Sequence, residues 1–268
     1  MIDHSPPADL DPSVARHLSA TTAYLNSGAS QVPGFLTRGA AAAIVTVLVE
    51  QLRADVRGAL AEIGVYHGKL FIALALARRP GEIALAVDLF SSRRGDFEAT
   101  FRNNCVTHGV PIENVHILRA DSQHLTPDRW VAALGMPARI VHVDGLHTRK
   151  AVLHDLALAA SHLAPAGVIV IDDIFHPWYP DVTEGIYAFL GGHPELVPVA
   201  YVDRTARLLD GGAKLIVAPV VHASRYRAAI NSTLKSHIVK AAPIAGTPTL
   251  ILAFDREAEL ASPQTPSP

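Results

Sequence analysis

The sequence has very little cysteine and no long block of like charge. Cys105 is the single cysteine among 268 residues, which excludes an internal disulfide and a zinc site built from several cysteines. Only 18% of the residues are charged and the formal net charge is −2, so the chain lacks a basic field for nucleic acid or an anionic membrane. We therefore expect a cytoplasmic protein with neither nucleic acid nor membrane as a partner.

Signals for secretion and for membrane insertion are also missing from the pattern. The opening residues, MIDHSPPADLDPS, are acidic and contain proline, and the longest apolar runs are broken before they reach the length of a bilayer span. What the sequence does have is apolar character, since 49% of its residues are hydrophobic. A chain of this length and composition can bury one large core.

Apolar runs of strand length alternate with helical stretches along most of the chain. The runs lack the apolar and polar alternation of half-exposed strands, which indicates strands buried on both faces of a parallel sheet. We predict a doubly wound α/β fold with a mostly parallel, seven-stranded sheet and helices on both faces. The predicted strands span 59–63, 83–88, 115–121, 139–144, 167–173, 196–203 and 249–255. Residues 204–248 break the rhythm and are interpreted as an insertion.

The first predicted strand runs into AEIGVYHGK, residues 61–69, where ligands bind in open α/β sheets. A dinucleotide fingerprint needs glycines at its first, third and sixth positions so that backbone can approach a pyrophosphate, and no such triplet occurs here. The order Glu62, Gly64 and Gly68 instead suits a cofactor without phosphate, such as S-adenosylmethionine. Glycines that only form turns, with acids that only cap them, are the alternative.

The next two strand ends are compatible with the same cofactor. Asp88 ends the second predicted strand, where a carboxylate can accept hydrogen bonds from both ribose hydroxyls. The third strand ends in ADSQ, residues 120–123, and places Ser122 and Gln123 where an adenine edge would lie.

Aspartates end the fourth and fifth predicted strands, in VDGLH and IDDIF. Neighbouring strand ends should bring Asp144, Asp172 and Asp173 together, and three carboxylates without a lysine or arginine nearby repel one another. A divalent cation such as Mg²⁺, which prefers oxygen ligands, would neutralise them and could lower the pKa of an acceptor hydroxyl. The alternative is that these acids cap loops or face solvent.

Histidine and aromatic residues follow these acids. His147 is three residues after Asp144, so the first turn of a helix starting there would point its side chain back towards the metal. Since imidazole has a pKa of about 6.5, we predict that His147 is the general base, with a metal-ligand or structural role as alternatives. His176, Trp178 and Tyr179 are candidate substrate-pocket residues in a loop, which could also be a simple hydrophobic plug.

Taken in order, EIGVYHG, VDLF, ADSQ, VHVDGLHTRKAVLHDL and GVIVIDD resemble the class I S-adenosylmethionine-dependent methyltransferases over roughly residues 55–190. The resemblance is strongest to catechol O-methyltransferases and to macrocin O-methyltransferases, which act on natural-product sugars. It implies cofactor contacts from Glu62, Gly64, Tyr66, Gly68, Asp88, Ser122, Gln123 and Asp144, and Mg²⁺ ligation by Asp144, Asp172 and Asp173. His147 stands where the catechol enzymes have a catalytic lysine, and the DGxH pattern is nearer the macrocin type.

The resemblance implies an O-methyltransferase that needs S-adenosylmethionine and a divalent metal and acts on a hydroxyl of a small-molecule sugar or phenol. An NAD-dependent oxidoreductase on a similar sheet and a non-catalytic binding protein with the same fold are the alternatives. We expect an N-terminal helical segment over 1–55, a methyltransferase domain over 56–260 with the insertion near 204–248, and a disordered tail over 261–268. The sequence leaves monomer and homo-oligomer open.

Overall fold

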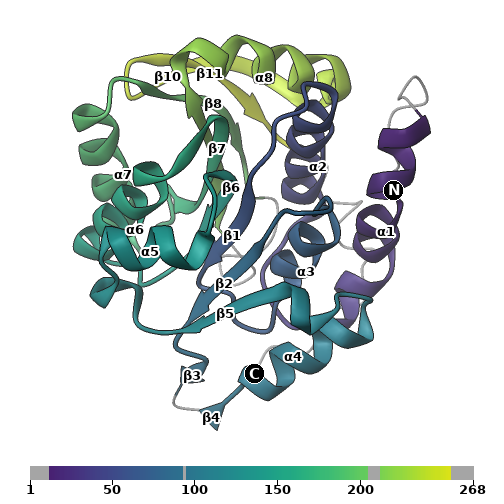
Figure 1. The fold of residues 1–268 in the computed structure, drawn as a ribbon. Helices are drawn as coiled ribbons and strands as arrows, with labels where there is room; N and C mark the ends of the chain where they lie inside the picture. Colours follow the sequence, from purple (N-terminus) through teal and green to yellow (C-terminus); the bar gives the residue numbers. More distant parts are fainter. Residues whose placement is uncertain (1–11, 93–94, 205–211, 255–268) are drawn as a thin grey trace.

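The computed structural model describes residues 12–92, 95–204 and 212–254. Its main sheet has nine strands in the order β10-β11-β8-β9-β7-β6-β1-β2-β5 (Figure 1). The seven predicted strands are present as β1 (Ala59–Ile63), β2 (Ala84–Asp88), β5 (Val115–Arg119), β6 (Ala138–Val143), β7 (Leu163–Ile174), β8 (Leu196–Val202) and β11 (Thr247–Leu252). A separate hairpin joins β3 (Ser91–Ser92) to β4 (Gly95–Asp96). The predicted tail over 261–268 lies outside the described residues.

The prediction of seven strands was wrong because β9 (Ala213–Pro219) and β10 (Ile238–Ile244) also belong to the sheet. Both lie in the segment interpreted as an insertion, yet β9 occupies the middle of the sheet between β7 and β8. β9 is antiparallel to both neighbours, and β10 is antiparallel to β11. An antiparallel strand needs no crossover helix before it, so the alternation of strands and helices did not reveal β9. The other five pairings are parallel.

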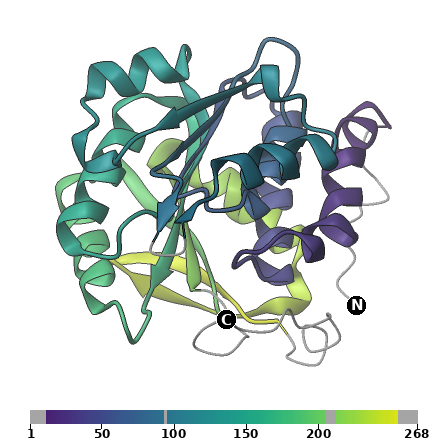
Figure 2. The same cartoon turned by 90° about the horizontal axis from the view of Figure 1, so that it is seen from below.

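Helices cover both faces of the sheet, as predicted. One layer contains α1 (Pro12–Asn26), α2 (Arg38–Arg53), α3 (Lys69–Leu76), α4 (Glu98–Thr107) and α8 (Val220–Thr233). The other contains α5 (Pro127–Leu134), α6 (Arg149–Ser161) and α7 (Pro180–Gly192). Short 3-10 helices span Gly28–Gln31, Ile112–Asn114, Ser122–His124 and Lys235–His237. Figure 2 shows the strands between the two helical layers.

Each face of the sheet has its own apolar core. Leu60 of β1 packs towards the layer with α1 to α3, whereas Ala61 and Ile63 pack towards the layer with α5 to α7. Because both faces are covered, strand residues of either orientation are apolar, which explains the uninterrupted apolar runs. The described part of the N-terminal helical segment shares the first core with the sheet. Within the described residues, no helix combines the length and apolar character required to cross a membrane.

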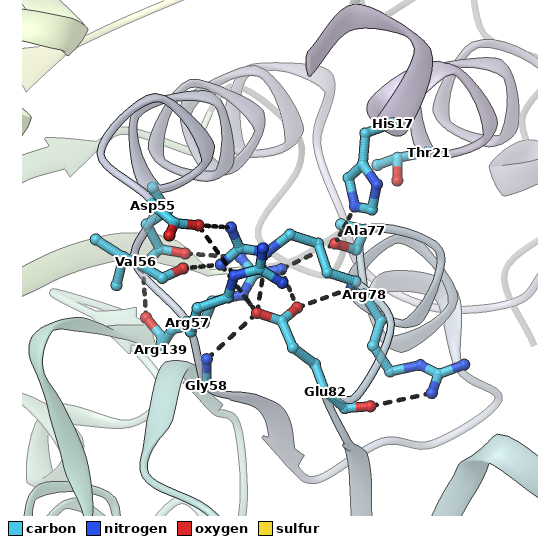
Figure 3. A network of polar contacts seen from close by, with 12 residues as sticks. His17, Thr21, Asp55, Val56, Arg57, Gly58, Ala77, Arg78, Glu82 and Arg139 are labelled. Atoms are coloured by element: carbon cyan, nitrogen blue, oxygen red, sulfur yellow. Dashed lines mark hydrogen bonds and ion pairs between the residues drawn. The ribbon is translucent and has the colours of Figure 1, made fainter. Parts of the chain in front are cut away.

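A buried network of charges joins the amino ends of the strands to the first helical layer (Figure 3). Glu82 accepts hydrogen bonds from the guanidinium groups of Arg79 and Arg139 at 3.0 to 3.1 Å. Arg139 also donates to the side chain of Gln51 in α2 at 2.8 Å and to the carbonyl of Ala77 at 2.8 Å. The charges of Glu82 and Arg139 at this end of the sheet are therefore paired and structural.

Candidate active site

A cleft of about 380 Å³ lies at the carboxyl ends of β1, β2, β6 and β7, the lower edge of the sheet in Figure 1. Its volume is within the range of roughly 300–1,000 Å³ that is usual for small-molecule sites. Most of the predicted site residues line it, namely Glu62, Gly64, Tyr66, Asp88, Asp144, His147, Asp172, Asp173, His176, Trp178 and Tyr179. Gly68, Ser122 and Gln123 are not among the lining residues.

Gly64 is required by a close approach between the β1–α3 loop and the end of β6. Its φ is +86°, and a Cβ at this position would lie 1.8 Å from the carbonyl oxygen of Asp144. Gly68, also at positive φ, caps the start of α3 and packs against Phe101 instead of the cleft. The absence of a side chain at Gly64 therefore allows the backbone after β1 to approach the backbone at the end of β6, beside the cleft.

Replacing Gly64 with alanine should lower the free energy of unfolding by more than about 2 kcal/mol, since a steric clash adds to the cost of a positive φ. Gly81→Ala is the matched control, because Gly81 has a φ of +83° but nothing within 4 Å of the added Cβ. Urea denaturation gives the free energy of unfolding of both variants. The loss in Gly81→Ala reports the cost of the positive φ alone, and the additional loss in Gly64→Ala reports the steric clash. Equal losses in the two variants would show that the approach to Asp144 is not a constraint.

The Asp88 carboxylate is held in place at the end of β2 by backbone. Its Oδ2 accepts a hydrogen bond from the amide of Tyr66 at 2.7 Å, and its Oδ1 accepts one from the amide of Phe90 at 2.7 Å. Each carboxylate oxygen can accept a further hydrogen bond. Asp88 is half-buried in the cleft wall, so a ligand with two adjacent hydroxyls can reach both oxygens.

Glu62 and His142 form a buried pair across β1 and β6. Oε1 of Glu62 lies 2.9 Å from Nδ1 of His142, while Oε2 of Glu62 and Nε2 of His142 have no hydrogen-bond partner among the described residues. Burial, with the nearby charge of Asp144, raises the pKa of Glu62 well above its usual range. Burial, with the nearby charge of Lys214, lowers the pKa of His142 to about 3, so its imidazole is neutral. His142 is thus a buried residue, hydrogen-bonded to Glu62, that also lines the cleft.

The three aspartates are accompanied by a lysine, contrary to the prediction that no lysine or arginine lies near them. The ammonium of Lys214, on β9, contacts Oδ2 of Asp172, and both side chains are buried. Although burial opposes the charge of Lys214, the Asp172 carboxylate raises the pKa of this lysine. The sequence analysis did not predict a role for Lys214, because this residue lies in the segment interpreted as an insertion. The antiparallel pairing of β9 with β7 brings it next to Asp172.

His147 lies between two of the aspartates. Its Nε2 is 2.9 Å from Oδ2 of Asp173 and 3.4 Å from Oδ1 of Asp144, and its ring packs on Tyr179 with centroids 4.2 Å apart. Burial opposes the imidazolium, but hydrogen bonds and charge from the two carboxylates raise the pKa of His147 to about 10. Thr148 caps α6, so His147 belongs to the loop before the helix and not to its first turn. In this state the imidazole is protonated and cannot accept a proton.

An irregular strand end lets two consecutive aspartates line one cleft. Side chains alternate between the faces of a regular strand, so Asp172 and Asp173 should point in opposite directions. Asp173 has a φ of +61°, and the register between β7 and β9 shifts between Ile171 and Ile174. Backbone in this rare conformation is a feature of functional sites.

Ser122 and Gln123 contact Asp155 of α6, behind the β6–α6 loop. Gln123 donates from Nε2 to Oδ1 of Asp155 at 3.3 Å, and Ser122 is also hydrogen-bonded to this carboxyl group. Burial raises the pKa of Asp155 to about 6. A Cβ on Gly145 would lie 2.4 Å from Oδ2 of Asp155, so this cluster supports the loop that carries Asp144. Adenine contacts from Ser122 and Gln123 stay a prediction.

Aromatic side chains form the outer wall of the cleft. His176 is buried and stacks on Tyr179 with ring centroids 4.7 Å apart, while the exposed Trp178 is at the rim. Sequence reasoning missed the loop before α2, where Phe35 and Leu36 also line the cleft, and it missed Lys69 at the start of α3. The loop carries no chemical motif, so only the packing of α2 on the sheet places it here.

A family model described as a methyltransferase domain matches residues 61–174, which run from the middle of β1 to the end of β7 and include Glu62, Asp144 and Asp172. No curated protein sequence matches this chain. The O-methyltransferase NovP has a similar structure, with a TM-score of 0.57 and 13% identity over 75% of this chain and 98% of that chain.

Two further solved structures are similar. CalS11, a TDP-rhamnose 3′-O-methyltransferase of calicheamicin biosynthesis, has a TM-score of 0.51 and 17% identity over 78% of this chain and 95% of that chain. The cofactor-bound Rv0187 from MTB has a TM-score of 0.53 and 17% identity over 80% of this chain and 93% of that chain. At such identities the likeness establishes a shared fold. The family match confirms the predicted resemblance to methyltransferases over residues 61–174, the part of this chain that matches a methyltransferase domain.

Proposed function

We propose that this protein is an O-methyltransferase that uses S-adenosylmethionine and a divalent metal to methylate a hydroxyl of a small molecule, a natural-product sugar or a phenol. The observation that supports this most is the arrangement of one cleft. Glu62 and Asp88, suited to the cofactor, and Asp144, Asp172 and Asp173, suited to a metal, all line it. We also propose that the enzyme works in the cytoplasm, alone or as a homo-oligomer, and not on nucleic acid or membranes.

The residues present fit the cofactor. Oε2 of Glu62 is buried and has no partner among the described residues, so it offers an acceptor to the ammonium of the amino-acid portion. Gly64 and Tyr66 also line the cleft and would contact that portion of the cofactor. Asp88 keeps acceptor capacity for the ribose hydroxyls, and Ser122 and Gln123 are proposed to lie by the adenine. The β1–α3 loop has no glycine triplet, which argues against NAD.

The residues also fit a divalent metal, since carboxylate oxygens of Asp144 and Asp173 lie on either side of His147. When bound, the metal would act as a Lewis acid and lower the pKa of the acceptor hydroxyl. Trp178, Tyr179 and His176 would orient the acceptor and exclude water. Proton acceptance by His147 requires that the charges of Asp144 and Asp173, which hold its proton, be neutralised first.

Asp88→Ala should weaken binding of S-adenosylhomocysteine about thirtyfold, because charge-assisted hydrogen bonds to both ribose hydroxyls are together worth about 2 kcal/mol. Calorimetry gives the affinity, and a melting curve without ligand checks that the variant is folded. Asp128→Ala, an exposed acid of α5 outside the cleft, is the control. Unchanged affinity in a folded Asp88→Ala variant would remove Asp88 from the cofactor site.

The function as a whole is tested by ligand-induced stabilisation and by methyl transfer. S-adenosylmethionine and S-adenosylhomocysteine should raise the melting temperature, whereas NAD should not, because only a ligand of the native state stabilises it. A panel of phenols and glycosides with a labelled methyl donor should then identify an acceptor. Stabilisation by NAD alone would favour the oxidoreductase, and cofactor binding without transfer to any hydroxyl would favour a binding protein.

A further inference from the structure

The cleft contains a lysine that has no counter-charge. Lys69, at the start of α3, is the single lysine or arginine among the described residues that line the cleft. Its ammonium forms no hydrogen bond or ion pair with any residue that the structure describes. Burial lowers the pKa of Lys69, whereas at Lys214 nearby carboxylates outweigh burial and raise the pKa. A partly desolvated cation such as Lys69 is unfavourable until an anion pairs with it.

The base of the Lys69 side chain is held by the loop before α2 and by α1. A Cβ on Gly34, whose φ is +146°, would lie 3.0 Å from Cβ and 3.7 Å from Cδ of Lys69, so this loop packs on the lysine stem. The hydroxyl of Tyr24 in α1 donates to the carbonyl of Lys69 at 2.9 Å. These contacts fix the start of the side chain in the cleft wall, where an anionic group of a ligand can pair with the ammonium.

Two ligands of the proposed reaction could supply the anion, namely the cofactor through its carboxylate and the acceptor. The ammonium and the carboxylate of the cofactor are attached to one carbon atom, and Glu62 is proposed to bind the ammonium. A lysine that bound the cofactor carboxylate would lie near Glu62, and the charge of Glu62 would raise the pKa of that lysine. No carboxylate of the described residues raises the pKa of Lys69. The acceptor is therefore the better source of the anion.

The cleft also offers aromatic side chains to a ligand. Phe35 and Trp178 line it and are 57% and 51% exposed, although both are large and apolar. The rings of His147, Tyr179 and His176 are stacked, with centroids 4.2 and 4.7 Å apart. Side chains of this kind bind flat, apolar rings. No serine, threonine, asparagine or glutamine of the described segments lines the cleft to recognise sugar hydroxyls.

We propose that the acceptor is a hydroxylated aromatic acid, with its carboxylate bound by Lys69 and its hydroxyl beside Asp144 and Asp173. The inference rests on the proposed O-methyltransferase function and names the acceptor class within it. The methyl group passes from the cofactor sulfonium to the acceptor oxygen, S-adenosylhomocysteine forms, and the hydroxyl proton is released to solvent. Because the other charged groups of the cleft wall are mostly carboxylates, the acid can bind only at Lys69, which orients the hydroxyl away from it.

The test compares a dihydroxybenzoate with the matching dihydroxybenzamide, which has the same shape but no charge. We expect kcat/KM to be about tenfold or more higher for the acid, mainly through a lower KM, because a charge-assisted hydrogen bond is lost with the amide. Lys69→Met keeps the length of the side chain and should bring the two acceptors within about threefold of each other. Lys240→Met, an exposed lysine of β10 outside the cleft, is the control and should keep the preference.

Reversing the charge gives a variant that must gain an activity. Lys69→Glu should methylate a dihydroxybenzylamine about tenfold or more faster than the dihydroxybenzoate, because the ammonium of the amine replaces that of the lysine as partner. Such a gain cannot come from a variant that has failed to fold. Preference for the acid in Lys69→Glu would overturn the proposal.

The remaining outcomes separate the acceptor class from the function. Equal kcat/KM for the acid and the amide in the unmodified protein would overturn the role of Lys69. Weaker binding of S-adenosylhomocysteine by folded Lys69→Met, measured by calorimetry, would assign the lysine to the cofactor carboxylate and overturn the acceptor class. Methylation of sugars or sugar phosphates but of no phenol would also overturn it and leave the O-methyltransferase standing. Transfer to no hydroxyl at all would overturn both.

Discussion

Chelation should abolish methyl transfer by this protein, and added Mg²⁺ or Mn²⁺ should restore it, while S-adenosylhomocysteine still binds. We propose that Glu62 and Asp88 contact the cofactor and that Asp144 and Asp173 help to hold the metal, so removal of the metal should leave the cofactor contacts in place. Lewis-acid stabilisation is worth several kcal/mol, so the rate should fall about a thousandfold. Labelled methyl incorporation after dialysis against a chelator measures the rate, and calorimetry on the same sample measures cofactor binding.

Full activity after exhaustive chelation would contradict the metal requirement.

His147→Ala distinguishes the three roles considered for His147, which are metal ligand, general base and structural residue. A lost ligand weakens metal binding, and excess metal partly restores the rate. A lost general base leaves metal and cofactor affinity intact but flattens the acidic limb of the pH–rate profile. Normal turnover with that limb intact would leave only a structural role.

Glu82→Gln should lower the free energy of unfolding by about 3–5 kcal/mol, because it removes the counter-charge of the buried Arg139 and leaves the buried Arg79 with only the exposed Asp55 as its partner. Arg139 is completely buried and Arg79 nearly so, and both donate to the Glu82 carboxylate (Figure 3). Urea denaturation at pH 7 measures the loss. Glu98→Gln is the control, since Glu98 pairs with the half-exposed Arg102 on one helix and should cost less than about 1 kcal/mol.

The same network predicts a pH dependence. Burial raises the pKa of Glu82, but the charge of Arg139 and hydrogen bonds from Arg139 and Arg79 outweigh it, so the net pKa is lowered. A group with a lowered pKa contributes stability above its unfolded pKa, about 4.3 for glutamate, and loses it as the pH falls through the folded value. The difference in the free energy of unfolding between the unmodified protein and Glu82→Gln should therefore narrow below about pH 4. A difference that stays constant down to acid pH would show that the ionised Glu82 carboxylate is not the stabilising group.

The local pattern of the chain determined the layers and the position of the cleft. Strands covered on both faces must be apolar throughout, and helices between them impose parallel pairing, so seven strands could be predicted without coordinates. The carboxyl ends of neighbouring parallel strands meet at one edge. That rule alone is enough to place Asp88, Asp144 and the pair Asp172 and Asp173 at a common cleft.

Partners of individual side chains could not be predicted in this way, because they depend on register and on contacts between distant segments. Glu62 faces His142 because these residues are paired across β1 and β6. Lys214 reaches Asp172 because β9 returns antiparallel beside β7, a pairing that leaves no periodic signal in the sequence. The sequence thus determined which acids meet at the cleft, and the tertiary structure decided which of them is already neutralised, since that depends on a lysine 42 residues further along the chain.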